Sequence, residues 1–265
     1  MKIVRVLLLA TGLLFAASAK AAIWSDLWWN PTESGWGVTI TQQGNVMFLT
    51  YFVYDATGAA KWFTATLNGG ATQSNGHKRY DGDLYETRGP FYGGSFDPAK
   101  VTVRKVGTSS FVPANTYSAA FSYSVDGVAV NKQIQRQSFT HIQLGGKYFG
   151  GYTIATTTCS GVPVGGFGTI RLELAATVNA DGLSGNLDTQ VSFGDAASPC
   201  TLTGTYRQHG SIYSVTNTAA CTSGNTGEKV NFSDLSSTDD GIDGNITVVE
   251  PSGCFLGVTF SAVRY

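Results

Sequence analysis

Alternating apolar and polar residues run through most of the chain after its first 22 residues. In the first such run, Trp36, Val38 and Ile40 share one face of an extended segment, and glycine and threonine occupy the other. A turn follows, and then comes the apolar run Val46–Tyr54, which we expect to be buried on both faces. A second turn leads to the strand-like run Lys61–Leu67. This order predicts three antiparallel strands in a meander.

The rest of the first half continues this pattern with one interruption. Residues 69–100 are richer in glycine and polar residues, which predicts short strands and loops. Further along, Tyr117–Val125 and Val128–Gln135 flank Asp126-Gly127, and an Asp-Gly pair between two such runs is a strong hairpin signal. Leu144-Gly145-Gly146 then breaks the alternation and marks a domain boundary.

The second half repeats a seven-residue phrase. Asp181–Leu187 and Asp240–Ile246 match at nearly every position, and each has the form of a turn that opens into a strand. Glycines within each phrase predict close packing or a bend. Short strands at regular spacing predict an all-β chain of two antiparallel, sandwich-like or barrel-like domains, residues 22–144 and 145–265. We expect the second domain to be an up-and-down barrel or a closed sandwich.

The first 21 residues have the features of a secretory signal peptide. Lys2 and Arg5 precede the apolar run Val6–Phe15, and Ala19-Lys20-Ala21 supplies the small-x-small cleavage pattern. That run is too short to span a bilayer, which needs about 20 residues. We therefore expect a secreted or periplasmic protein that is not membrane-embedded.

The charge of the chain excludes one class of partner. Charged residues make up only 13% of the sequence, and 17 bases nearly balance 18 acids. This balance offers no basic footprint for nucleic acid, so we expect no nucleic-acid partner. Serine, threonine, asparagine, glutamine and glycine must cover the solvated faces instead, as in many exported β proteins.

All four cysteines lie in the second half, and in an exported chain they indicate disulfides rather than metal ligands. Cys200 and Cys221 flank two strand-like runs joined near His209-Gly210, so a hairpin places them opposite one another within disulfide range. That leaves Cys159 with Cys254, which would tie the first strand of the domain to its last. The other two connectivities stay open at this point.

The five tryptophans all lie in the first half, and three of them fall in Asp26–Gly37, which reads Asp-Leu-Trp-Trp-Asn-Pro-Thr-Glu-Ser-Gly-Trp-Gly. Indole rings beside carboxylates and amides suit carbohydrate recognition, because sugar C–H faces stack on the ring while polar groups bind the hydroxyls. The Asn-Pro and Ser-Gly pairs predict a loop, where binding residues are often found. The candidate ligand-binding residues are Trp28, Trp29, Trp36, Asp26, Asn30 and Glu33.

The alternative is that these rings fill a core, since a small β domain must bury large residues. Adjacent Trp28 and Trp29 cannot both face inward on an extended segment. We therefore expect at least one of the two to be exposed or to cover a domain edge.

Through this motif the chain resembles a widespread group of secreted proteobacterial proteins. The likeness continues to about residue 139 and is looser in the second half, at Gly204–Gln208 and in the cysteine spacing. It implies a protein exported by a Gram-negative cell and implies no catalytic residue. The further segments that carry it are Gln42–Gly44, Tyr54–Gly58, Trp62, Gly89-Pro90, Phe96-Asp97 and Tyr123–Gly127.

Carboxylate pairs raise the question of hydrolysis. A glycosidase needs two carboxyl groups across a cleft, and Glu33 with Asp26 or Asp55, or Asp81 with Asp83, would supply such a pair. Nothing in their spacing distinguishes them from turn residues.

Oxygen ligands also gather in Asp239–Asn245, but the spacing departs from the EF-hand pattern and the distal glutamate is missing. The three histidines have no metal-ligand spacing. We expect no metal and no cofactor.

The leading hypothesis is therefore an exported, non-catalytic binding module that contacts a glycan or similar surface polymer through its aromatic N-terminal segment. One alternative is a secreted hydrolase that uses Glu33 and a second carboxylate. Another is a structural or inhibitory module that binds a protein through a sheet edge.

Overall fold

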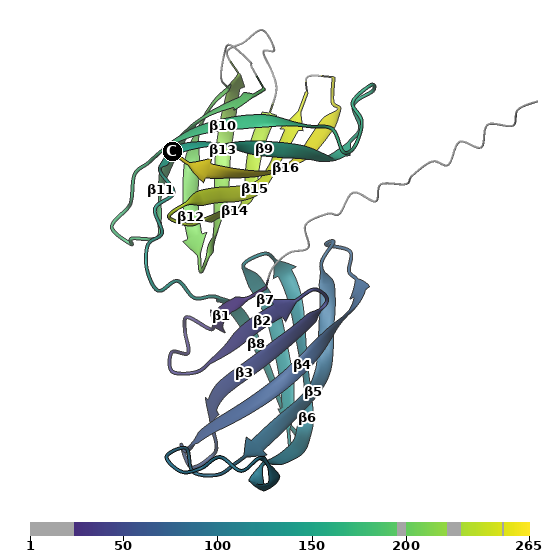
Figure 1. Cartoon of the computed structure of the whole chain (residues 1–265), viewed down its shortest axis with the longest axis vertical. Coiled ribbons are helices and arrows are strands. Elements are labelled where there is room, and N and C mark those ends of the chain that lie inside the picture. The colour runs from purple at the N-terminus through teal and green to yellow at the C-terminus, as the bar shows by residue number, and fades with distance from the viewer. Residues whose placement is uncertain (1–23, 195–199, 222–228, 251) are drawn as a thin grey trace, which may run out of the picture.

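The chain forms two closed antiparallel barrels of eight strands each (Figure 1). The computed structural model describes residues 24–194, 200–221, 229–250 and 252–265. Within each barrel every strand pairs with the next along the chain, and the last strand returns to the first. The predicted all-β class with two antiparallel domains is confirmed, and the second domain is an up-and-down barrel.

The first barrel has longer strands than the sequence indicates. Of the short strands and loops expected over residues 69–100, the short strands are wrong, because β4 continues to Thr72 and β5 runs for 11 residues, whereas residues 89–97 form a loop. No helix in the described part of the chain is long and apolar enough to cross a membrane. The elements are β1 (Asp26–Trp29), β2 (Gly37–Gln43), β3 (Val46–Tyr54), β4 (Ala60–Thr72), β5 (Lys78–Arg88), the 3-10 helix η1 (Pro98–Lys100), β6 (Thr102–Asn115), β7 (Ser118–Val125) and β8 (Val128–Arg136).

Side chains of the first barrel alternate between its packed interior and the solvent. On β3, Met47, Leu49 and Tyr51 are buried, whereas Val46 and Phe48 are exposed. The expectation that this strand is buried on both faces is wrong, because a barrel wall has only one inner face. Its outer apolar residues therefore lie at the surface.

The hairpin between β7 and β8 follows its turn chemistry. Asp126 and Gly127 have φ angles of 48° and 87°, and Val125 pairs with Val128. Two consecutive positive φ values are those of a type I′ turn, whose twist matches that of the strands. The predicted hairpin is confirmed.

The second barrel contains the repeated phrase at two strand starts. A Cβ atom at Gly185 would overlap the carbonyl oxygen of Thr177, and one at Gly244 would crowd Leu235. The predicted close packing at these glycines is confirmed. The strands are β9 (Gly146–Thr157), β10 (Phe167–Ala176), β11 (Ser184–Phe193), β12 (Cys200–His209), β13 (Ile212–Cys221), β14 (Lys229–Ser237), β15 (Gly241–Val249) and β16 (Phe255–Arg264).

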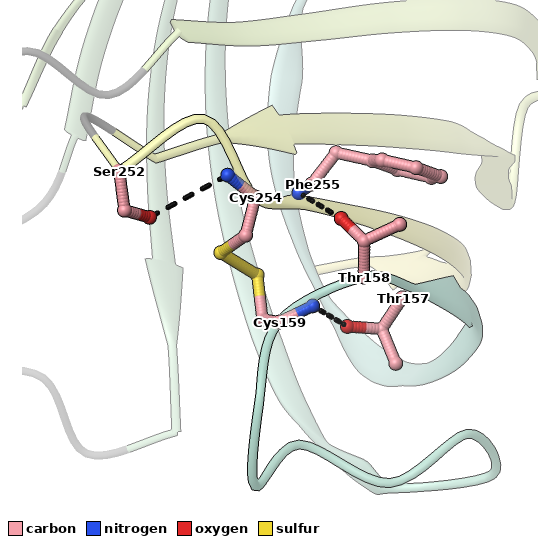
Figure 2. Close-up of a disulfide and its surroundings, with 6 residues drawn as sticks. All are labelled: Thr157, Thr158, Cys159, Ser252, Cys254 and Phe255. Carbon is pink, nitrogen blue, oxygen red and sulfur yellow. Dashed lines mark hydrogen bonds between the residues drawn. A yellow bond between two sulfur atoms is a disulfide. The ribbon is translucent and has the colours of Figure 1, made fainter.

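One disulfide is described, between Cys159 and Cys254 (Figure 2). It joins the end of β9 to the start of β16, so it ties the first strand of this barrel to its last, as predicted. Cys200 pairs directly with Cys221 across β12 and β13, which confirms the predicted register. The side chain of Cys221 lies outside the described residues, so the predicted bond between Cys200 and Cys221 falls outside the part of the chain that the structure describes.

Residues 137–145 connect the barrels. Ile142 and Leu144 pack in the core of the second barrel, and the Tyr148 hydroxyl donates to the Leu144 carbonyl at 2.9 Å. The expected boundary after Leu144 falls in this connector, although Leu144 itself packs with the second barrel.

Candidate functional site

The first part of the tryptophan motif is core. The Trp28 ring is fully buried against Phe111, with centroids 5.1 Å apart, and its Nε1 donates to the Trp24 carbonyl at 3.0 Å. A sugar cannot stack on a ring that has no exposed face. The prediction that Trp28 contacts a ligand is therefore wrong, and the alternative reading of Trp28 as core applies.

Asp26 connects the two barrels. Its carboxylate pairs with Arg136 at 3.0 Å and accepts hydrogen bonds from the backbone N–H and the hydroxyl of Ser211, both at 3.1 Å. Only 2% of the Arg136 side chain is exposed, and burial lowers the pKa of its guanidinium despite the neighbouring carboxylate. Asp26 is thus occupied inside the junction, and the prediction that it binds a ligand is wrong.

The junction is formed by the turn between β12 and β13. The His209 ring stacks on Tyr117 at 4.0 Å, and the Gly210 N–H donates to the Ser138 hydroxyl at 2.8 Å. A Cβ atom at Gly210 would overlap the Asp26 carboxylate. The turn therefore fits closely against the first barrel.

The second part of the motif is the loop between β1 and β2. The Glu33 carboxylate accepts from Lys132 Nζ at 2.8 Å and from Trp36 Nε1 at 3.0 Å, and Lys132 lies 5.8 Å from the Trp36 ring centroid. The hydrogen bond from Lys132 lowers the pKa of Glu33 most strongly. Asn30 Oδ1 accepts from Thr32, which makes it a turn residue. These contacts hold the loop against β8.

The six predicted site residues therefore do not form one exposed cluster. Trp28 and Asp26 are in the core and the junction, while Trp29 and Trp36 are half-buried. The most exposed tryptophan of the described chain is Trp62, at 61%. The sequence reasoning missed it, although it shares its face of the strand with Thr64 and Thr66 and opposes the apolar face.

Trp62 belongs to an exposed aromatic face on β3 and β4. It pairs with Phe52 across the two strands, with ring centroids 6.1 Å apart. Phe48 and Tyr54 lie on the same side of β3 and are 49% and 58% exposed. Aromatic rings on an open surface are typical of contact sites for sugars and proteins. We refer to Phe48, Phe52, Tyr54 and Trp62 as the aromatic face.

A groove of about 580 Å³ crosses the outer wall of the same barrel over β5, β6, β7 and β8. Its volume is within the usual range of ligand sites. Five of its thirteen lining residues are serine or threonine, and we call it the hydroxyl groove. It is lined by Arg79, Asp81, Gly82, Asp83, Thr108, Ser109, Ser110, Ser122, Tyr123, Ser124, Ala129, Val130 and Asn131.

Small residues create this hollow. Ser110 pairs with Ser122 across β6 and β7, and Ser122 pairs with Asn131 on β8, so short side chains lie side by side. A Cβ atom at Gly107 would overlap the Ser124 carbonyl oxygen, so glycine there allows β6 and β7 to approach closely. Short outward side chains on adjacent strands leave a depression between taller neighbours.

The charges of the groove are internally paired. Arg79 Nε donates to both oxygens of Asp81 at 2.9 and 2.8 Å, and Lys105 contacts Asp83 at 2.8 Å. The pair with Arg79 lowers the pKa of the Asp81 carboxyl. The groove therefore offers hydroxyls, an amide and balanced charges, which suits an uncharged polar ligand better than a phosphate.

Three of the candidate acids have a pKa that is lowered rather than raised. A glycosidase needs one carboxylic acid whose pKa is raised. Instead, the hydrogen bonds from Lys132 to Glu33, from Thr57 to Asp55 and from Arg79 to Asp81 each lower the pKa of the carboxyl group.

In the described residues, one group has metal-ligand spacing, and it contains Cys159, Cys254 and Glu250. Both cysteines are in the disulfide, so their sulfurs are not thiolate ligands. His77 packs edge-on against Trp24 and His209 stacks on Tyr117, which are structural positions.

No protein-family model and no curated protein sequence matches the chain. A solved structure from Nostoc punctiforme, a protein of unknown function from the DUF3598 family, is similar at 9% identity with a TM-score of 0.34. The alignment covers 92% of this chain and 96% of that chain. At these values the similarity says nothing about the site.

Proposed function

We propose that this protein is an exported, non-catalytic binding module that holds an uncharged, hydroxyl-rich glycan in the hydroxyl groove. The observation that carries this proposal is a groove of about 580 Å³ whose lining includes five serine and threonine residues on β6 and β7. It replaces the tryptophan loop as the binding surface, because that loop is engaged with β8.

The chemistry of the groove supports a sugar. A serine or threonine hydroxyl both donates and accepts hydrogen bonds, and so does a sugar hydroxyl, so the two match in either direction. Asn131 adds an amide, whereas the Tyr123 ring packs inward against Tyr51 and Phe121. The paired Asp81 and Asp83 still have lone pairs that can accept from a ligand hydroxyl.

A long glycan would extend from the groove onto the aromatic face. The outward residue Asp83 of β5 pairs with Thr66 of β4, which in turn pairs with Phe48 of β3. The two surfaces are therefore neighbours around the barrel wall. In an exported Gram-negative protein, an envelope or extracellular polysaccharide is the corresponding ligand.

A blocked groove tests this function. Ser122→Trp places a large ring in the hollow, and Thr39→Trp places the same ring on the exposed outer face of β2 as a matched control. We expect wild type and T39W to bind the same glycans on a broad array and by calorimetry, and S122W to lose that binding. If no glycan binds wild type, or if S122W binds as well as T39W, the proposal fails.

A further inference from the structure

The first barrel is closed by a very short ladder. β1 pairs with β8 only at Trp28–Arg136 and Trp29–Gln135, and Gln137 N–H to the Leu27 carbonyl adds one bond at 2.8 Å. β8 continues for seven residues beyond this contact toward Val128. Along that length, the β1 side of β8 is a seam rather than a ladder.

Pro31 explains where the ladder ends. Continuing the register would place residue 31 opposite Gln133, and a proline has no N–H to donate to that carbonyl. Asn30 and Thr32 form a turn there, so the chain leaves the barrel wall. In the described structure, the backbone of residues 30–36 makes no hydrogen bond to β8.

The direction of the free backbone groups follows from two bonds. The Arg136 N–H donates to Tyr117, beside β7, whereas the Gln137 N–H donates to Leu27 in the opposite direction. Backbone groups alternate in direction along a strand. Ala129, Asn131 and Gln133 have the parity of Gln137, so their N–H and C=O groups face the seam.

These three residues form an exposed strand edge. Ala129, Asn131 and Gln133 are all exposed residues, and the described backbone makes no hydrogen bond to their seam-facing N–H and C=O groups. An unpaired strand edge is a template for another extended chain. The loop after β1 lies against β8 through the Glu33–Lys132 pair, and no helix or further strand of the described chain covers the edge.

We propose that this edge of β8 binds an extended peptide segment of a partner protein by strand addition. Donors and acceptors that alternate along a strand match the backbone of a second extended polypeptide, and a glycan has no such repeat. Ala129 and Asn131 also line the hydroxyl groove, but this site uses their backbone groups at the seam rather than their side chains, so it does not rest on the proposed glycan function.

The charge of Lys132 indicates which residue type the partner peptide should carry. Lys132 has inward parity on β8 and is 30% exposed, and it pairs with Glu33 of the loop. A side chain of the added strand that points the same way would lie beside this ammonium group. The partner segment should therefore have an acidic residue at that position, where it would compete with Glu33.

Asn131→Pro tests the edge through its backbone. Proline removes the seam-facing N–H of residue 131 and leaves the bonds between β7 and β8 in place, so the variant should fold with an unchanged circular dichroism spectrum. Asn131→Ala is the matched control, because it removes the same side chain and keeps the N–H. The probe is a library of random eight-residue peptides selected on wild type.

Selected peptides should bind wild type and N131A equally and bind N131P about tenfold more weakly or worse, because a buried acceptor loses its donor. In each peptide, N-methylation of alternate residues should abolish binding, while methylation of the intervening residues should not. Amide exchange at Ala129, Asn131 and Gln133 should slow on binding.

Failure to select any peptide, equal affinity of N131A and N131P, or N-methyl sensitivity without a period of two would overturn the proposal. A dimer that forms through β8 and is lost in N131P would assign the edge to a second copy and overturn it too. S122W should still bind the peptides, and N131P should bind glycans as N131A does, so failure of this site is distinguishable from failure of the groove.

Discussion

Replacing Asp26 with alanine should destabilise the first barrel more than any other single change at the junction. The variant removes the carboxylate from a guanidinium whose side chain is only 2% exposed. It also removes the acceptor of two hydrogen bonds from Ser211 of the second barrel. One substitution thus affects both a buried charge and the contact between the barrels.

The structure sets the size of this effect. Breaking a buried ion pair from one side costs about 3–5 kcal/mol, because the remaining charge stays buried without its partner. Arg136 keeps its bonds to the Thr116 carbonyl at 2.8 Å and the Ser25 carbonyl at 3.4 Å, and it lies 5.0 Å from the Trp28 ring centroid. We therefore expect Asp26→Ala to lower the free energy of unfolding by about 3 kcal/mol, the lower end of that range.

The chain provides a selective assay. All five tryptophans lie in the first half of the sequence, so tryptophan fluorescence reports unfolding of the first barrel alone. Urea titrations would compare wild type, Asp26→Ala, Ser211→Ala and Asp26→Ala/Arg136→Met. Ser211→Ala removes only one side-chain hydrogen bond to Asp26 and should cost about 1 kcal/mol.

The double variant separates the two contributions. Replacing Arg136 with methionine removes the buried charge whose ion-pair partner Asp26→Ala deletes, so it should recover at least half of the loss. Two results would refute this explanation: a loss of stability in Asp26→Ala no larger than in Ser211→Ala, or a double variant less stable than Asp26→Ala. Either would show that the Asp26 carboxylate does not act by compensating the buried charge of Arg136.

Four further outcomes follow. Burial, and after it the charges of Arg207 and Arg136, lower the pKa of His209 from its ordinary 6.5 to about 4. As the pH falls from 6.5 to about 4, the imidazole is therefore protonated in the unfolded chain but not in the folded one. Stability should therefore fall across that window by about 1–2 kcal/mol for this half-exposed group, and His209→Gln should lose less than wild type between pH 7 and pH 5 in urea titrations. Replacing both Cys159 and Cys254 with alanine should destabilise the second barrel by about 4 kcal/mol in calorimetry, because their sequence separation is 95 residues, and an unchanged second transition would contradict this. Gly107→Ala should lower the free energy of unfolding by about 1–3 kcal/mol, because its Cβ would overlap the Ser124 carbonyl oxygen. Gly127→Ala is the comparison, because its Cβ meets no atom and any loss there comes from the positive φ alone. Trp62→Ala should weaken long glycans and leave short ones unchanged if the ligand extends onto the aromatic face, and equal loss for both lengths would argue against that extension.

Most strands of the first barrel could be predicted from the sequence because the wall of a barrel has one dry face. Alternation located β2, an apolar run located β3, and Asp126-Gly127 located the turn between β7 and β8. The same logic failed over residues 69–88, where polar outward residues and glycines conceal the end of β4 and the whole of β5. Alternation also could not choose between a sandwich and a barrel, because a period of two does not say which strand meets the last one.

The site could not be predicted, for a different reason. The hydroxyl groove depends on register across four strands, which brings Asp81 and Asn131 to one surface from positions far apart in the sequence. Tryptophan clustering is ambiguous by nature, since the ring is both a core residue and a contact residue. The usable signal was parity: Phe63, Ala65 and Leu67 form the inner face of β4, which leaves Trp62 outside.

The tryptophan motif closes the first barrel although the first strand of that barrel is short. Trp28 fills the core beside the last pair of the ladder, and Pro31 ends that ladder. The loop is then held to β8 by side chains alone, through Glu33 and Lys132. Because the closure uses no backbone bond beyond Gln135, the same motif that seals the barrel leaves the edge of β8 unpaired. Pro31→Thr should therefore lengthen β1 and extend the ladder to Gln133. Amide exchange at Gln133 should then slow, and a peptide should be excluded from the seam. An unchanged exchange rate would show that the turn at Asn30, rather than the proline, ends the strand.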